Sequence, residues 1–136
     1  MKFIDQMVFE KGKGDCVRAC LASILEFPIK DMPNFWEVAY NVEEFWKLVN
    51  TWISDNYNYN CLITKNLPTL ECKDILCIAI GSPAHCDGKE CEEVHAVIWF
   101  EGKVIFDPHP NRAGLSKINS FLFLIPTINR FKDPTA

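Results

Sequence analysis

The hydrophobic pattern changes period near the middle of the chain, and this change constrains the fold more than any other feature. Before residue 57, apolar side chains at 42, 45, 46, 49 and 53 follow helical spacing. After residue 60, the apolar residues gather in short runs rich in β-formers, at 61–64, 75–80, 94–100, 103–107 and 121–125. Helices followed by such strands predict an α+β domain, with N-terminal helices packed on a small antiparallel β-sheet.

Local signals place the ends of these elements. A first helix is expected over residues 15–26, with Asp15 as a possible N-cap and Phe27-Pro28 ending it. Asn41, followed by two glutamates, suits the start of a second helix over residues 41–54. Glu101-Gly102 separates two strand-like runs and predicts a tight hairpin turn.

Length and composition exclude several classes of protein. With 136 residues, 49% of them hydrophobic, the chain suits a single domain spanning residues 1–136. A net charge of −4 argues against binding to long nucleic acid, which needs a basic face. No run approaches the roughly 18 apolar residues of a membrane span, and residues 1–6 lack the core of a signal peptide. A cytoplasmic location is therefore expected.

The seven cysteines are more easily explained as reduced thiols than as a disulfide framework. Their number is odd, and the absence of an export signal favours a reducing compartment. Cys77 lies inside an apolar run and is expected to be a small buried hydrophobe. Cys20 follows Cys16 by four positions, on the same helix face, and is expected to pack inward as well.

Cys16 carries the strongest chemical signal in the sequence. Gly14-Asp15 predicts a sharp turn that delivers this cysteine to the first turn of a helix, where unpaired backbone N–H groups favour a thiolate. His95 opens one strand-like run and Asp107 closes the next. A base within reach of a thiol takes its proton, and a carboxylate fixes the tautomer of that base. We therefore expect Cys16, His95 and Asp107 to be nucleophile, base and orienter.

Each member of this set also has a purely structural explanation. Cys16 could be a buried cysteine, His95 a strand histidine bonded to backbone, and Asp107 part of an Asp-Pro turn. Gln6, ten residues before Cys16, is a candidate oxyanion donor or an ordinary surface glutamine. His109 competes for the role of base, but its position between two prolines favours a rim residue that contacts substrate.

A metal site is the main competing arrangement. His85, Cys86, Cys91 and His95 lie within eleven positions and are possible zinc ligands. The gap of four residues between the two cysteines is not a common structural-zinc spacing, and a zinc-bound His95 could not serve Cys16. No metal and no other cofactor is therefore expected.

The segments around the three candidate residues resemble the C39-like peptidases, which are papain-like cysteine hydrolases. The stretch from Asp15 to Ile24 is similar to their nucleophile helix, although Val17 stands where they usually have glycine. Residues 95–98 resemble their histidine strand, and Asp107-Pro108 their Asp-Pro pair. The resemblance implies a papain-like fold with Cys16, His95 and Asp107 as catalytic triad and Gln6 as oxyanion donor. Residues 107–115 are also similar to small proteins of bacteria and their phages.

The substrate is less constrained than the chemistry. A peptidase or isopeptidase is favoured, because that outcome is commonest for this constellation. Cleavage of a small non-peptide ligand, such as a cyclic nucleotide immune signal in phage counter-defence, is an alternative in which Trp36 would stack and Arg18 and Arg112 would meet phosphates. A non-catalytic binding module is the second alternative.

Overall fold

The computed structural model describes residues 1–9, 14–65, 74–84 and 94–127 of the chain. Its elements follow in the order α1 (Cys16–Leu25), η1 (Ile29–Asp31), η2 (Phe35–Glu37), α2 (Val42–Tyr57), β1 (Tyr59–Thr64), β2 (Cys77–Pro83), β3 (His95–Phe100), β4 (Lys103–Phe106) and β5 (Leu115–Pro126). Helices therefore precede strands, and the prediction of an α+β domain is confirmed.

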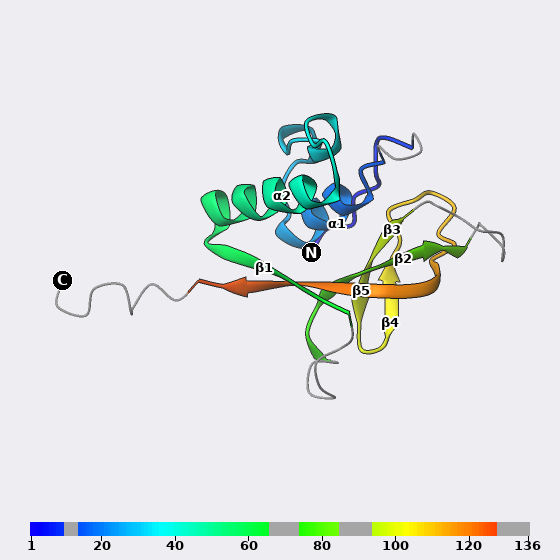
Figure 1. Ribbon diagram of the computed structural model, residues 1–136. Helices are drawn as coiled ribbons and strands as arrows, with labels where there is room; N and C mark the ends of the chain where they lie inside the picture. Colours follow the sequence, from blue (N-terminus) through cyan, green and yellow to red (C-terminus); the bar gives the residue numbers. More distant parts are fainter. Residues whose placement is uncertain (10–13, 66–73, 85–93, 128–136) are drawn as a thin grey trace.

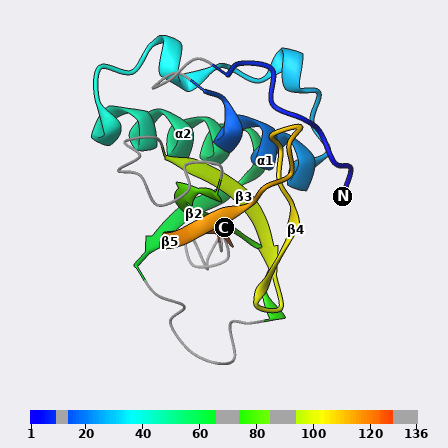
Figure 2. The ribbon, with the colours of Figure 1, turned by 90° about the vertical axis from the view of Figure 1, so that its right-hand side faces the viewer.

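The five strands form one antiparallel sheet with the order β1-β5-β2-β3-β4. The described helices lie on the same side of this sheet in both ribbon views (Figures 1 and 2). Alternate residues of the strands face opposite sides, so Ile78, Ala96 and Ile98 join the core beneath the helices. Ala79 and Val97, one position along, belong to a second apolar cluster on the other face, together with Phe121 and Phe123.

The core between helices and sheet is built from α1, in which residues 16–23 are all buried, and from one stripe of α2. Leu21 of α1 is fully buried, as are Val49 and Ile53 of α2, which are spaced four apart. α1 contacts β3, and α2 contacts β1. This packing places the first turn of α1 at the end of the sheet where β3 begins. No described helix combines the length and the hydrophobicity that crossing a membrane requires.

Several predicted boundaries are confirmed and others shift. Glu101 and Gly102 form the β3–β4 turn with φ of 52° and 77°, and the Asn41 side chain accepts from the Glu44 N–H at 2.8 Å, as an N-cap does. α2 continues beyond residue 54 to Tyr57, where Asn58 in the left-handed region ends it.

β5 is the largest departure from the sequence prediction, because it begins at Leu115 and not near residue 121. Its first half mixes exposed with half-buried residues without regular alternation, and its register against β2 shifts twice, between Ile80 and Gly81 and between Ser82 and Pro83. A Cβ added at Gly81 would lie 1.8 Å from the Lys117 carbonyl oxygen, so this close approach requires glycine. A bulged strand without a continuous apolar run has no clear sequence signature.

Candidate active site

Cys16 is the first residue of α1 and is largely buried, with 7% of its surface exposed. The turn before it is fixed by Asp15, but not in the way the sequence predicts. Asp15 occupies the N-cap position, yet its side chain does not cap the helix. Asp15 Oδ1 instead accepts the backbone N–H groups of Met7 and Val8 at 2.9 and 2.8 Å, and Oδ2 accepts from Arg18 Nη1 at 3.3 Å. The buried carboxylate thus ties residues 7–8 to the turn that presents Cys16.

His95 is the first residue of β3, the strand against which α1 packs. The two elements are joined at this end by the Cys20 thiol, which donates to the Ala96 carbonyl at 3.6 Å. Cys20 is fully buried, as predicted, and burial raises the pKa of its thiol. With the helix held in this way, the Cys16 side chain forms a hydrogen bond with the His95 ring.

Asp107 directly follows β4 and contacts the same imidazole at Nε2. His95 Nε2 and Asp107 Oδ1 are 2.6 Å apart, and both side chains are buried. The carboxylate also accepts the backbone N–H of His109 at Oδ1, at 2.9 Å, and that of Gly114 at Oδ2, at 2.7 Å. The predicted nucleophile, base and orienter are therefore brought together in one hydrogen-bonded chain.

The electrostatics of this chain favour a charged imidazolium. Burial disfavours the charged ring, but the hydrogen bonds to Asp107 and Cys16 outweigh it and raise the pKa of His95 to about 9. Burial likewise opposes ionisation of Asp107, yet the hydrogen bonds from His95, His109 and Gly114 lower its pKa. At neutral pH, His95 thus holds a proton beside the sulfur.

Gln6 lies in the N-terminal segment and is buried. Its backbone N–H donates to the Pro108 carbonyl at 3.0 Å, and its side-chain Nε2 donates to the Val8 carbonyl at 2.9 Å. A carboxamide nitrogen has two N–H donors, so one remains after the bond to Val8. Gln6 Oε1 is buried and accepts no hydrogen bond from the residues that the structure describes.

His109 lies at the rim of the triad, as predicted. Its ring makes an edge contact with the His95 ring, at a centroid distance of 6.3 Å, and another with Phe9 at 5.2 Å. His109 Nδ1 accepts the Asn111 N–H at 3.1 Å. The histidine that bonds to both Cys16 and Asp107 is His95.

The other residues predicted to contact substrate are held by protein groups. Arg18 is buried and donates to the Ile29 carbonyl through Nε at 3.2 Å and Nη2 at 2.5 Å, besides its bond to Asp15. Trp36 stacks on Phe45 with 4.1 Å between ring centroids and packs against the core. These two side chains therefore stabilise the fold around the helices.

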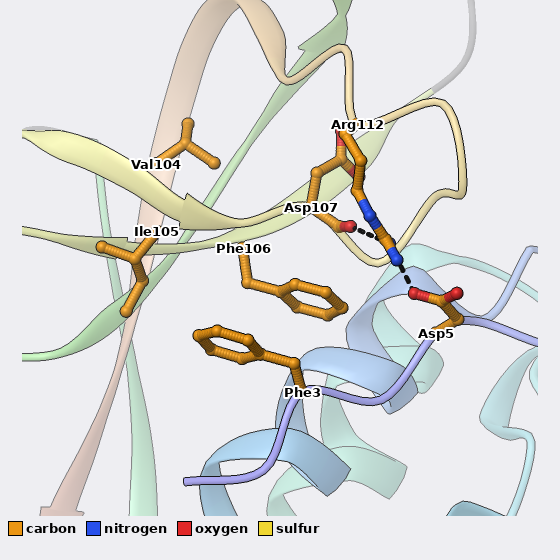
Figure 3. Close-up of a pocket in the computed structure, with 7 residues that line it drawn as sticks. All are labelled: Phe3, Asp5, Val104, Ile105, Phe106, Asp107 and Arg112. Carbon is orange, nitrogen blue, oxygen red and sulfur yellow. Dashed lines mark hydrogen bonds and ion pairs between the residues drawn. The ribbon is translucent and has the colours of Figure 1, made fainter.

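Arg112 closes the loop after β4, next to a surface cavity of about 650 Å³ (Figure 3). The cavity is lined by Phe3, Asp5, Val104, Ile105, Phe106, Asp107 and Arg112. Asp107 is part of its lining, whereas Cys16 and His95 are not.

The zinc alternative falls largely outside the described residues, because positions 85, 86 and 91 are not among them. Within the described ranges, no three His, Cys, Asp or Glu side chains are grouped in a way that could hold a metal ion. His95, the fourth candidate ligand, is bonded to Asp107 and Cys16.

Two contributions to the site were not predicted from the sequence. The anchoring of residues 7–8 by Asp15 involves backbone groups, which leave no residue-type signal. Gly114, which donates to Asp107, has φ of 78°, and the sequence signal that could have indicated this conformation is a glycine at the end of a loop that contains two prolines. Comparisons of the chain with models of protein families, with curated proteins and with solved structures find no match.

Proposed function

We propose that this protein is a papain-like cysteine hydrolase in which Cys16, His95 and Asp107 form the catalytic triad. The observation that supports it best is the chain from sulfur to imidazole to carboxylate, with 2.6 Å between His95 Nε2 and Asp107 Oδ1. A buried histidine that served only packing would not need an ionised carboxylate fixed by two backbone N–H groups. Strongly perturbed titratable groups of this kind concentrate at functional sites.

The proposed reaction begins with a thiolate on Cys16 and a proton on His95. Since Nε2 is bonded to Asp107, Nδ1 is the nitrogen that exchanges a proton with the sulfur. The thiolate attacks a substrate carbonyl carbon and forms a tetrahedral intermediate. His95 then gives its proton to the leaving amine, the C–N bond breaks and a thioester remains on Cys16. Water, deprotonated by His95, attacks the thioester, and the C–S bond breaks to release the acid and to restore the Cys16 thiolate beside the protonated His95.

The negative oxygen of the tetrahedral intermediate needs hydrogen-bond donors. The N–H groups in the first turn of α1, that of Cys16 among them, have no acceptor within the helix. Gln6 is the proposed second donor, through the Nε2 proton that is not given to Val8. The bond from its backbone to Pro108 keeps the residue beside the orienter loop.

We propose a peptide or isopeptide as substrate. The nucleotide alternative depended on Arg18, Arg112 and the tryptophans as binding groups. Arg18 donates to Ile29 and Asp15, and Trp36 and Trp52 make ring contacts with Phe45 and Phe35. A carbonyl carbon with an amine leaving group is the chemistry that this triad serves directly.

Alkylation with iodoacetamide at pH 7, followed by peptide mapping, tests the nucleophile. We expect Cys16 to react first, well ahead of Cys61, because burial raises the pKa of Cys61 to about 11. His95→Ala should slow the reaction at Cys16 about 100-fold, whereas the matched variant His109→Ala should leave it near the wild-type rate. The assignment of the base is wrong if the two variants behave the other way round.

The substrate is tested by incubating the protein with a peptide library and, separately, with cyclic and linear nucleotides, and by following each pool by mass spectrometry. We expect cleaved peptides with the wild-type protein and none with Cys16→Ala. Turnover of nucleotides alone would contradict the peptide assignment. Cleavage that survives in Cys16→Ala would show that Cys16 is not the nucleophile, whereas a wild-type protein that binds peptides without cleaving them would support a binding module.

A further inference from the structure

Residues 3–8, here called the N-terminal strap, connect the two halves of the proposed active site. At one end, the Met7 and Val8 N–H groups are held by Asp15, next to the nucleophile. Toward the other end, the Gln6 N–H donates to the carbonyl of Pro108, next to the orienter. The strap thus spans from the turn before Cys16 to the loop of residues 107–114, here called the orienter loop.

Arg112 is the side chain that fastens the strap to the orienter loop. Its Nη1 donates to the Asp107 carbonyl at 2.6 Å and to the His109 carbonyl at 3.2 Å, and it forms an ion pair with Asp5 of the strap. Figure 3 shows the guanidinium between the two aspartates. One group therefore bonds the backbone of the orienter itself and the segment that carries Gln6.

An aromatic stack supports the same contact. The Arg112 guanidinium carbon lies 4.8 Å from the centroid of the Phe106 ring, and Phe106 stacks on Phe3 of the strap with 4.6 Å between centroids and 3° between planes (Figure 3). Arg112 also has φ of 53°, a conformation that costs free energy for a residue other than glycine. Arg112 thus adopts an unfavourable backbone conformation at a position where its side chain makes four contacts.

We propose that Arg112 is a positioning residue of the active site, which acts through Asp107 on the base His95 and through Asp5 on the strap that carries Gln6. The inference rests on the proposed function, because the residues that Arg112 would position belong to the proposed active site. It also replaces the expectation from sequence that Arg112 contacts substrate, because the Nη1 donors are directed to Asp5, Asp107 and His109.

The ion pair of Arg112 with Asp5 should affect His95 less than the bonds of Arg112 to the two backbone carbonyls do. The Arg112 and Asp5 side chains are 47% and 45% exposed, so water and salt screen their attraction. The bonds to the carbonyls of Asp107 and His109 do not depend on a second charge. Removing the cation should therefore disturb His95 more than removing Asp5 does.

The experiment compares Arg112→Gln, Arg112→Lys and Asp5→Asn with the wild-type protein and with Lys117→Gln, a control that removes an exposed charge of the same sign from β5. NMR titration of the His95 ring measures its proton affinity. We expect Arg112→Gln to lower that affinity about tenfold and Asp5→Asn about threefold, with recovery in Arg112→Lys and no change in Lys117→Gln. Exchange of the Gly114 and Gln6 amides should accelerate in the same order.

Each outcome decides the inference. An unchanged His95 titration in Arg112→Gln overturns it, even if amide exchange accelerates, because Arg112 would then only stabilise the loop. The alkylation rate of Cys16 separates this inference from the proposed function. If wild-type Cys16 is unreactive but Arg112→Gln still lowers the proton affinity of His95, the positioning role stands and the hydrolase proposal fails.

Discussion

The site contains two buried aspartates, and their surroundings differ in one respect. Asp15 and Asp107 are 2% and 3% exposed, and each accepts two backbone N–H groups. The third donor to Asp15 is the guanidinium of Arg18, whereas the third donor to Asp107 is the imidazole of His95. In both places two backbone N–H groups hold a carboxylate, but the cation that the carboxylate faces is a guanidinium at Asp15 and an imidazolium at Asp107.

The difference lies in whether the cation can release its proton. A guanidinium keeps its charge over the whole pH range in which proteins fold, so the Asp15–Arg18 pair is suited to holding the turn before Cys16. An imidazolium exchanges its proton near neutral pH, and Asp107, together with Cys16, raises the pKa of His95 to about 9. The first pair therefore suits scaffolding, and the second suits proton transfer.

The largest effect should come from breaking the permanent pair. Asp15→Asn leaves Oδ1 to accept from Met7 and Val8 but places an amide N–H group against the buried Arg18 cation. We expect the free energy of unfolding to fall by about 4 kcal/mol at pH 7, the usual range for a buried charge left without its partner. Urea denaturation followed by circular dichroism measures this loss.

Asp107→Asn is the matched control for that measurement. His95 can respond to the loss of the carboxylate by releasing its proton, so the cost should be limited to the stability that its raised pKa contributes, about 3 kcal/mol. An equal loss of stability in the two variants would show that the distinction between a permanent and an exchangeable cation is wrong.

The second effect is the pH dependence of stability that the Asp107–His95 pair contributes. The pKa of His95 rises from 6.5 to about 9 on folding, so its contribution is complete below pH 6.5 and is lost as the pH rises through 9. At roughly 1.4 kcal/mol per pKa unit the loss is about 3 kcal/mol. Asp107 acts in the opposite range, because its lowered pKa gives stability above pH 3.8 that is lost on further acidification.

His95→Gln tests this pH dependence. The free energy of unfolding, measured with urea, should fall less between pH 6 and pH 10 in the variant than in the wild-type protein. Only the wild type has an imidazolium that is deprotonated in this range. Asp15→Asn should retain the wild-type slope, since the Asp15–Arg18 pair does not involve His95. A wild-type slope in His95→Gln would place the titrating group elsewhere.

The sequence was sufficient for the parts of the site whose side chains have distinctive chemistry. Cys16, His95 and Asp107 were identified by residue type and by their places at the ends of predicted elements, and the structure brings them together. Asp15 lies at the predicted N-cap position, but its side chain does not make the capping bond that an aspartate there usually makes. Here its acceptors are used by Met7 and Val8, and backbone donors from a distant segment leave no pattern in the sequence.

The same limit applies to β5 and Arg112. The first half of β5 is held by a bulged pairing with β2 and not by an apolar run, so period-two alternation alone did not find it. Arg112 was predicted as a substrate contact because a guanidinium is suited to binding phosphate. Its partner Asp5 lies 107 positions away and becomes its neighbour only when the strap crosses the orienter loop.

The smallest predicted effect compares two glycines with nearly the same backbone conformation. Gly114 has φ of 78° and Gly102 has φ of 77°, and an added Cβ would meet nothing closer than 3.9 Å at either position. Replacement by alanine should therefore lower the free energy of unfolding by about 1 kcal/mol at each position, from the backbone conformation alone.

Only Gly114 of these two glycines donates to Asp107, so Gly114→Ala should in addition lower the proton affinity of His95, whereas Gly102→Ala should leave it unchanged. Thermal denaturation measures the shared cost, and NMR titration of His95 measures the difference. Equal titrations in the two variants would mean that the carboxylate holds its place without the Gly114 N–H, and that the backbone frame of Asp107 serves the fold and not the triad.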